Sequence, residues 1–403
     1  MRAVVAAILV LVVAGCASAP RQQMESYCCS PQPASELGVD TGYEQPAEPG
    51  PPEGLALPQF TGDKPLFFRW TLGKDLPASL KVKDGIVWIA LDSSVKDGPY
   101  DRLYIDANCD GSLADEQANP ADAGTRKGRA RFSLVEALLP GDRKPTPYHL
   151  NLQLNDSTKG NQLHVESACW NEGKVRIAGK EYRCVLIDGT ANGQFNDISP
   201  DPYNGDAMRF GPADAASSRG ELYATGRYME VQGAYYALQV APDGSSVAFT
   251  PARHIPSGSL NVPPDMTELS LAGPHGHFYC KPVAGRVTVP TGSYTVFRWA
   301  MERPDEGGRK WTLTGYGRQG APTVQVETGK EIALDVGEPV ISHVGVSKEG
   351  DDYIFTCRVP LKGRMGETVS LAVEKGGCAD PELRITNANG TYKQEVTLAT
   401  GFS

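Results

Sequence analysis

The chain has 403 residues, with 48 acidic and 39 basic side chains and a formal net charge of −9. This length allows two or three domains, each with its own core. The acidic balance argues against a nucleic-acid partner, because no excess of Lys and Arg is present to neutralise phosphates. The 44 Gly and 31 Pro residues disfavour a helical bundle and favour many short strands joined by turns.

The N-terminal residues have the pattern of an export signal. Arg2 precedes the apolar run AVVAAILVLVVAGC, which is too short for a membrane span and ends in small residues before Cys16. This run resembles the signal peptide of bacterial lipoproteins, in which that cysteine becomes the lipidated first residue of the mature chain. The resemblance implies a palmitate-bearing membrane anchor at Cys16 and a location in the bacterial cell envelope, at the outer membrane or the cell surface. The alternative is an ordinary cleaved signal peptide, and both alternatives predict export.

Residues 17–60 are rich in Pro, Glu, Gly and Ser, and they carry six acidic residues against one basic residue. A segment of this composition buries too little apolar surface to order itself. We therefore expect a disordered tether between the anchor and the folded body. Cys28 and Cys29 lie within it, and cross-linking to a partner or pairing with cysteines of the body are both open for them.

After the tether, apolar and polar residues mostly alternate, which is typical of half-buried strands. Turn signals recur about every ten residues, as in antiparallel sandwiches. The predicted fold class is mainly β, with two or more antiparallel β-sandwich-like domains. The predicted parts of the body are a β-rich domain over 61–255, a Pro-rich boundary near 256–268, a β-sandwich-like domain over 266–337, and over 338–403 either another small sandwich or strands that complete the second domain.

Two short segments add detail to this prediction. In SLVEALLP, Ser133 and Glu136 have the spacing of a helix capping box and Pro140 ends the run, so a helix is predicted there. The segment VTVPTGSYTV, residues 287–296, resembles the prealbumin-like and carboxypeptidase-regulatory-type β-sandwich modules, in which a strand reaches a Pro-Xaa-Gly turn and returns through a tyrosine. This resemblance implies a sandwich and no particular function.

Two segments repeat one pattern of oxygen-bearing residues, YIDANCDGSLADE from Tyr104 and LIDGTANGQFNDI from Leu186. In such a loop, side chains at positions 1, 3 and 5 and the backbone carbonyl at position 7 can direct oxygens to one cation, and the glycine at position 6 permits the sharp turn. The repeat therefore predicts two metal-binding loops. Their expected ligands are Asp106, Asn108, Asp110 and Ser112 in the first loop and Asp188, Thr190, Asn192 and Gln194 in the second.

These loops resemble the calcium loops of EF-hand and dockerin proteins and the D-x-N-x-D-G loops of secreted bacterial β proteins. The resemblance implies Ca²⁺ as a structural cofactor. Position 12 departs from the pattern, because Gln117 and Ser199 replace the usual bidentate acid. A metal-free polar turn is the alternative, since Asp, Asn and Gly are also common turn residues. The candidates for the missing carboxylate are Asp115, Glu116, Asp197, Asp201 and Asp206.

The nine cysteines include Cys16, and export permits disulfides among the other eight. The expected pairs are Cys169–Cys184, which flank a predicted hairpin, and Cys357–Cys378. The pair His275 and His277 near Cys280 could face one side of a strand as metal ligands, and a polar hairpin turn is the alternative. No P-loop, G-x-S-x-G or H-E-x-x-H motif appears, so no catalytic residue is assigned.

The D-x-N-x-D-G loops and the hairpin GRYMEVQGAYY together resemble a group of exported bacterial proteins, from which no activity can be carried over. The expected function is that of a non-catalytic, lipid-anchored envelope or cell-surface protein, which contacts the membrane through its lipid and an envelope protein or glycan through its body. The alternatives are an exported, glycan-directed hydrolase and a calcium-assisted carbohydrate-binding module. The second alternative predicts an aromatic platform built from Tyr235, Tyr236 or Trp311.

Overall fold

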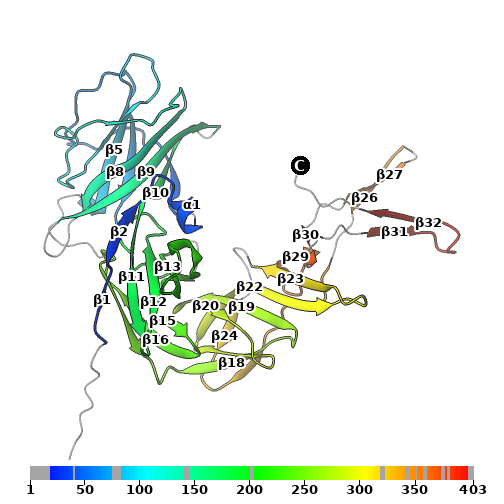
Figure 1. Ribbon diagram of the computed structural model, residues 1–403. Coiled ribbons are helices and arrows are strands. Elements are labelled where there is room, and N and C mark those ends of the chain that lie inside the picture. Colours follow the sequence, from blue (N-terminus) through cyan, green and yellow to red (C-terminus); the bar gives the residue numbers. More distant parts are fainter. Residues whose placement is uncertain are drawn as a thin grey trace, which may run out of the picture.

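The computed structural model of the chain confirms that the protein is mainly β (Figure 1). Its strands form mostly antiparallel sheets around two large hydrophobic cores. Among the described residues, no helix is long and apolar enough to cross a membrane. Cys16, the predicted lipidation site, lies outside the described part of the chain. The structure describes residues 19–39, 41–74, 83–139, 145–158, 160–199, 204–317, 323–341, 345–350, 352–356, 361–373, 377–378 and 382–397.

The first core is enclosed by four sheets, and alternating side chains of their strands fill it. Trp70 and Phe68 are among its largest fully buried side chains. The short 3-10 turns η1 (Lys83–Gly85) and η2 (Ser217–Arg219) connect strands of these sheets. The four sheets have the spatial orders β4 (Leu66–Thr71), β5 (Ile86–Asp92), β6 (Arg102–Ile105), β7 (Asn119–Pro120); β3 (Tyr43–Pro46), β10 (Gly160–Ser167), β9 (Thr146–Ser157), β8 (Arg129–Leu139); β14 (Glu221–Ala224), β13 (Ala207–Pro212), β12 (Lys180–Ile187), β11 (Cys169–Ile177), β2 (Ser26–Cys29); and β1 (Gln22–Gln23), β17 (Ser246–Pro251), β16 (Ala234–Val240), β15 (Tyr228–Val231).

The segment SLVEALLP is not a helix, so that prediction is wrong. Its described residues, 133–139, belong to strand β8, which pairs with β9 along most of its length. The register shifts between Phe132 and Val135, and Leu134 adopts a left-handed φ of 55°. This β-bulge adds one residue to the alternation. The buried residues 132, 135 and 139 therefore fall at i, i+3 and i+7, spacings that imitate one face of a helix.

The expected disordered tether is also wrong for its described part. Three strands of this segment join the body as edge strands: β1 pairs with β17, β2 with β11, and β3 with β10. A short helix, α1 (Pro33–Leu37), lies between β2 and β3, and its Leu37 is only 1% exposed. Composition misled here, because an edge strand is held largely by backbone hydrogen bonds to its neighbour, which any residue except proline can donate.

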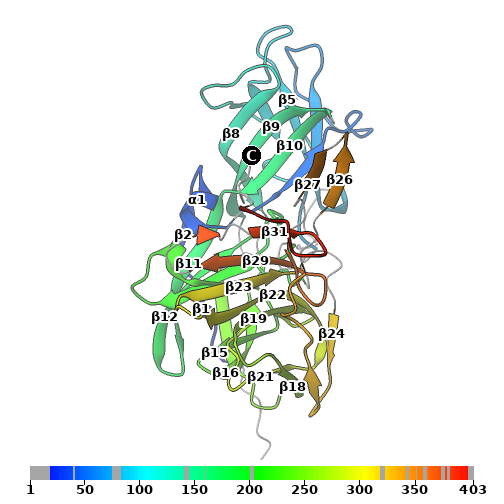
Figure 2. The same ribbon diagram turned by 90° about the vertical axis from the view of Figure 1, so that its right-hand side faces the viewer.

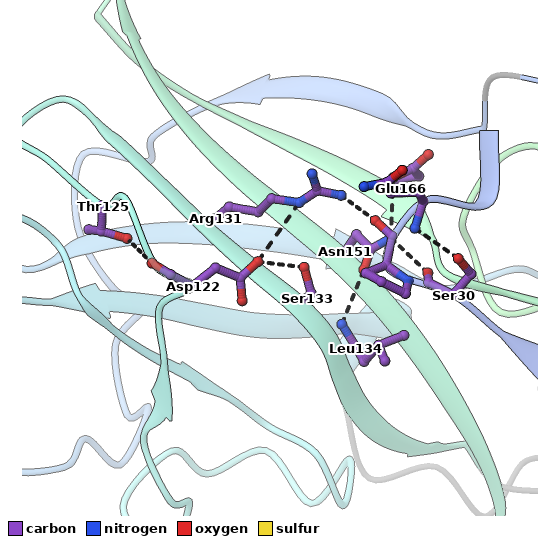
Figure 3. A network of polar contacts seen from close by, with 10 residues as sticks. Ser30, Asp122, Thr125, Arg131, Ser133, Leu134, Asn151 and Glu166 are labelled. Atoms are coloured by element: carbon purple, nitrogen blue, oxygen red, sulfur yellow. Dashed lines mark hydrogen bonds and ion pairs between the residues drawn. The ribbon is translucent and has the colours of Figure 1, made fainter. Parts of the chain in front are cut away.

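A polar network fixes the turn after β2 to the first core (Figure 3). The buried Asn151 side chain, on β9, donates to the Ser30 carbonyl at 3.2 Å and accepts the backbone N–H of Leu134 at 3.1 Å. The guanidinium of Arg131, on β8, donates to the Pro31 carbonyl. The N-terminal segment and the bulge of β8 therefore share one buried amide, which satisfies polar groups of both.

The second core begins at β18 (Ser257–Asn261), inside the Pro-rich stretch that was expected to be a boundary. Strands from the last predicted part complete its larger sheet, as one of the two alternatives proposed: β29 (Thr368–Val373) pairs with β23 (Lys310–Tyr316) (Figure 2). The two cores meet where the Arg227 backbone N–H donates to the His275 carbonyl at 2.9 Å. The sheets of this half are β21 (Arg286–Pro290), β18, β25 (Glu331–Ala333); β20 (Gly276–Cys280), β19 (Met266–Gly273), β22 (Gly292–Pro304), β23 (Lys310–Tyr316), β29, β28 (Leu361–Lys362), with β24 (Thr323–Val326) on β22 and β30 (Gly377–Cys378) on β29; and the hairpins β26 (Gly345–Glu349) with β27 (Asp352–Thr356) and β31 (Glu382–Thr386) with β32 (Lys393–Thr397).

Candidate metal centre

The first predicted loop follows β6 directly and turns around the carboxylate of Asp106. One oxygen of this buried carboxylate accepts the backbone N–H of Asp110 at 2.9 Å, and the other accepts that of Gly111 at 2.9 Å. Cys109 and Gly111 have left-handed φ values of 56° and 86°. The glycine at position 6 is therefore needed for its backbone conformation, as the loop pattern predicts.

The second loop follows β12 and repeats this construction. One oxygen of the buried Asp188 carboxylate accepts the N–H of Asn192 at 3.3 Å, and the other accepts that of Gly193 at 2.7 Å. Ala191 and Gly193 have φ values of 51° and 83° at the positions equivalent to Cys109 and Gly111. The sequence repeat is therefore also a repeat of backbone conformation.

In both loops the acid at position 10 lies beside the side chains of positions 3 and 5. Asp115 accepts a hydrogen bond from the Asn108 amide at 3.4 Å, and the same amide donates to Asp110 at 3.2 Å. Asp197 likewise accepts from the Thr190 hydroxyl at 3.2 Å and from the Asn192 amide. In each loop, hydrogen bonds thus link the side chains of positions 3, 5 and 10.

The remaining predicted metal ligands make other contacts. The Glu116 carboxylate accepts the N–H of Ala107 at 2.8 Å and so caps the start of the first loop. The Ser112 hydroxyl accepts the N–H of Ala114 at 3.1 Å. The Gln194 side chain is buried against Gly73, outside its loop. Position 7 therefore has only its backbone carbonyl to offer a cation, as the loop pattern expects. Asp201 lies outside the described residues.

Each loop is fastened to the body by an apolar side chain and by the N-terminal segment. Leu113 and Phe195, two positions after the glycines, are buried. The Leu113 N–H donates to the Ala56 carbonyl at 2.8 Å, and the N–H of Gly42 donates to the Gly189 carbonyl of the second loop at 3.2 Å. Residues predicted to be tether therefore hold both loops in place.

The second loop carries the strongest electrostatic perturbation of the candidate site. Burial, together with the nearby Asp197 charge, raises the pKa of Asp188 to about 6. Burial and the Asp188 charge raise the pKa of Asp206 well above its ordinary value. Asp206 accepts the backbone N–H groups of Gly189 at 3.0 Å and Asp197 at 2.7 Å. Buried carboxylates this close need either protons or a cation to balance their charge.

Two aromatic residues support the second loop, and no sequence motif pointed to them. The Trp70 indole N–H, from β4, donates to the Ala191 carbonyl at 2.6 Å, and its ring stacks on Tyr148 with centroids 5.6 Å apart. The Tyr148 hydroxyl, from β9, donates to Asp188 at 2.6 Å. The only sequence signal for them is that both lie in segments predicted to be strands.

The donor set of each loop is mixed. Within the described residues, no group of three or more His, Cys, Asp or Glu side chains could hold a metal ion. Each loop instead combines carboxylates with amide or hydroxyl oxygens and a backbone carbonyl. These are hard oxygen donors, the type that Ca²⁺ takes.

The predicted Cys169–Cys184 disulfide is wrong, because the two residues are not opposite each other in the hairpin and are too far apart for a bond. The register of the β11–β12 hairpin places Cys184 opposite Gly173, which is four residues from Cys169 along β11, roughly 13 Å at the rise of a strand. The Cys184 sulfur contacts the Met208 sulfur at 3.2 Å. Cys357 and the side chain of Cys378 lie outside the described part of the chain.

The other sequence candidates occupy separate places. His277 is buried and hydrogen-bonded to the Ser270 hydroxyl, and burial lowers its pKa to about 4. His275 contacts the Thr291 carbonyl at 3.1 Å. Of the predicted aromatic platform, Tyr236 is buried, Tyr235 donates to the Thr288 carbonyl at 3.0 Å, and the Trp311 indole donates to Asp305 at 3.0 Å.

Comparison of the chain with protein-family models, with curated proteins and with solved structures finds no match in any of the three.

Proposed function

We propose that the protein is a non-catalytic, exported β protein of the bacterial envelope, anchored by lipid on Cys16, whose two loops bind Ca²⁺ as a structural cofactor. The observation that carries the calcium proposal is the shared geometry of the loops. In each, an acid at position 10 accepts a hydrogen bond from the side chain of position 3, and a buried aspartate at position 1 caps the turn. This arrangement supplies the carboxylate that position 12 lacks.

The negative charges of neighbouring aspartates in each loop favour binding of a divalent cation. Burial and the charges of Asp110 and Asp115 raise the pKa of Asp106 in the first loop, and burial and the charges of Asp188 and Asp197 raise that of Asp206 at the second. A cation that binds between them would remove like-charge repulsion and the cost of burying Asp188. Sites of this kind in extracellular modules bind calcium with millimolar-class affinity, which suits an exported protein. The proposed role of the cation is to hold the loops in place against the sheets.

Calcium is expected to raise the melting temperature of the full chain relative to EDTA. At a hundredfold excess over Kd, each site adds about 2.7 kcal/mol of stability, which corresponds to roughly 5–10 °C. Asp115→Asn and Asp197→Asn remove one ligand charge each and leave the backbone caps on Asp106 and Asp188 intact. Each should reduce the shift, and the double variant should abolish it.

Asp63→Asn is the matched control, because Asp63 pairs with Lys96 on the surface outside the loops. It should keep the full shift. A shift that persists in the double variant would show that calcium binds elsewhere, and equal melting temperatures of the wild type in calcium and EDTA would contradict the proposal.

The calcium-induced shift in melting temperature should also depend on pH. The pKa of Asp188 is raised in the folded protein, so without metal its protonation stabilises the fold fully below the ordinary value of 3.8, and this contribution is lost as the pH rises through about 6. Protons and calcium therefore compete for this carboxylate. The calcium-induced shift should be smaller at pH 5 than at pH 7, and a larger shift at pH 5 would contradict a role for Asp188.

The lipid anchor is tested separately in bacteria that express the full chain. Labelled palmitate should enter the protein, and the protein should sediment with the membrane fraction. Cys16→Ser should abolish both, whereas the control Cys28→Ser should change neither. A labelled or membrane-bound Cys16→Ser variant would contradict the anchor.

A further inference from the structure

Two cysteines far apart in the sequence lie on adjacent strands. Cys29 is the last residue of β2 and Cys169 the first of β11, and the register places them directly opposite each other. Cys29 is exposed, whereas Cys169 is 1% exposed. Both are free thiols in the structure.

The hydrogen bonds around this pair show which type of antiparallel pair it is. The Ser30 N–H donates to the Ala168 carbonyl at 2.9 Å, and the Ala168 N–H donates to the His149 carbonyl at 2.9 Å, so residues 30 and 168 make one of the two bonds of a hydrogen-bonded pair. Because the two types alternate along a ladder, Cys29 and Cys169 form a non-hydrogen-bonded pair, in which the Cα atoms lie about 4.5 Å apart and the side chains on one face are closest. Disulfides span Cα separations of about 4.4–6.8 Å.

Cys28 provides a contrast within the same strand. It is opposite Trp170, and as the neighbour of Cys29 along the strand it directs its side chain to the other face of the sheet. Neither the register nor the alternation favours a bond from Cys28 to Cys169, or one between the two adjacent cysteines.

We propose that Cys29 and Cys169 form a disulfide in the exported protein and thereby fasten β2, near the lipid anchor, to β11 of the first core. This inference goes beyond calcium binding and rests on the proposed export only for an oxidising compartment. Cys29 lies 13 residues after Cys16 (29 − 16). A pull on the anchor would therefore reach the body first through β1 and β2, and the bond would prevent this edge from separating.

The oxidant is a disulfide-bearing thiol compound or an enzyme with a reactive disulfide. The exposed Cys29 thiolate attacks one sulfur of that disulfide, forms a mixed disulfide and releases one thiolate. The Cys169 thiolate then attacks the Cys29 sulfur, which forms the protein disulfide and releases the second thiolate. Two electrons pass to the oxidant, and the two cysteine protons leave to solvent or to the released thiolates. Burial raises the pKa of Cys169 to about 12, so the second step is the slow one and accelerates with pH.

In the test, the purified full chain is incubated with oxidised glutathione. The remaining thiols are then blocked, the chain is digested with trypsin, and the masses of its peptides are measured. Trypsin should yield peptide 160–174, which contains Cys169, linked to peptide 22–69, which contains Cys28 and Cys29. The Cys28→Ser variant should give the same linked pair and should melt at roughly 5 °C or more above its reduced form. The Cys29→Ser variant should give no such pair and no rise.

Other products would overturn the inference. These are a bond between Cys28 and Cys29, a linked pair that disappears in Cys28→Ser, and a peptide 160–174 that stays unlinked after oxidation at pH 9. Because calcium and lipid are absent from this experiment, its failure is distinguishable from failure of the calcium or the anchor proposal.

Discussion

A chain that begins at residue 61 is expected to be destabilised by about 5 kcal/mol or more, which is comparable to the whole stability of many domains. It loses the backbone ladders of β1, β2 and β3 and the buried side chain of Leu37. It also leaves the buried Asn151 amide without its Ser30 partner. Thermal unfolding followed by circular dichroism measures the loss.

The truncation should also weaken calcium binding, because Ala56 and Gly42 hold the two loops through their backbone hydrogen bonds. A chain that begins at residue 19 is the matched control, since it keeps every described strand. It should melt as the full chain does and respond equally to calcium. If the chain from residue 61 melted within about 2 °C of that control, a difference well below the expected loss, the N-terminal strands would have no stabilising role.

Trp70→Ala is expected to cost about 3–5 kcal/mol, the usual range for removing a fully buried aromatic side chain. Trp70 is completely buried and stacks on Tyr148. Its loss also leaves the buried Ala191 carbonyl without a donor. Because Ala191 lies inside the second loop, the variant should lose calcium affinity at that loop as well as stability. Chemical denaturation and calcium titration measure the two effects.

Two further variants separate packing from hydrogen bonding. Trp70→Phe keeps an aromatic ring but removes the indole N–H, so it should cost about 1–3 kcal/mol and still weaken calcium binding. Trp311→Phe, the same change at a half-buried indole on β23 of the second half that donates to Asp305, should leave calcium binding unchanged. Full calcium affinity in both Trp70 variants would contradict the proposed support of the loop.

The two loops show which interactions the local sequence can specify. Asp, Asn and Gly at fixed spacing determine a turn in which position 1 caps the backbone of positions 5 and 6, and both loops have it. These interactions join residues only a few positions apart, so spacing alone specifies them. Trp70 reaches the second loop from β4 and Asp206 from the segment just before β13, and no spacing within the loop places them there.

The sequence by itself determined that the protein is mainly β, because alternation reports which face of a strand is buried. It also determined the two loops, because their hydrogen bonds are local. Only the tertiary structure decided that β1, β2 and β3 are edge strands, that residues 133–139 lie in a bulged strand, and that Cys29 lies opposite Cys169. The physical reason is that strand pairing is made by backbone groups far apart in the chain. Those groups are alike in nearly every residue, so side-chain composition does not record which strands pair.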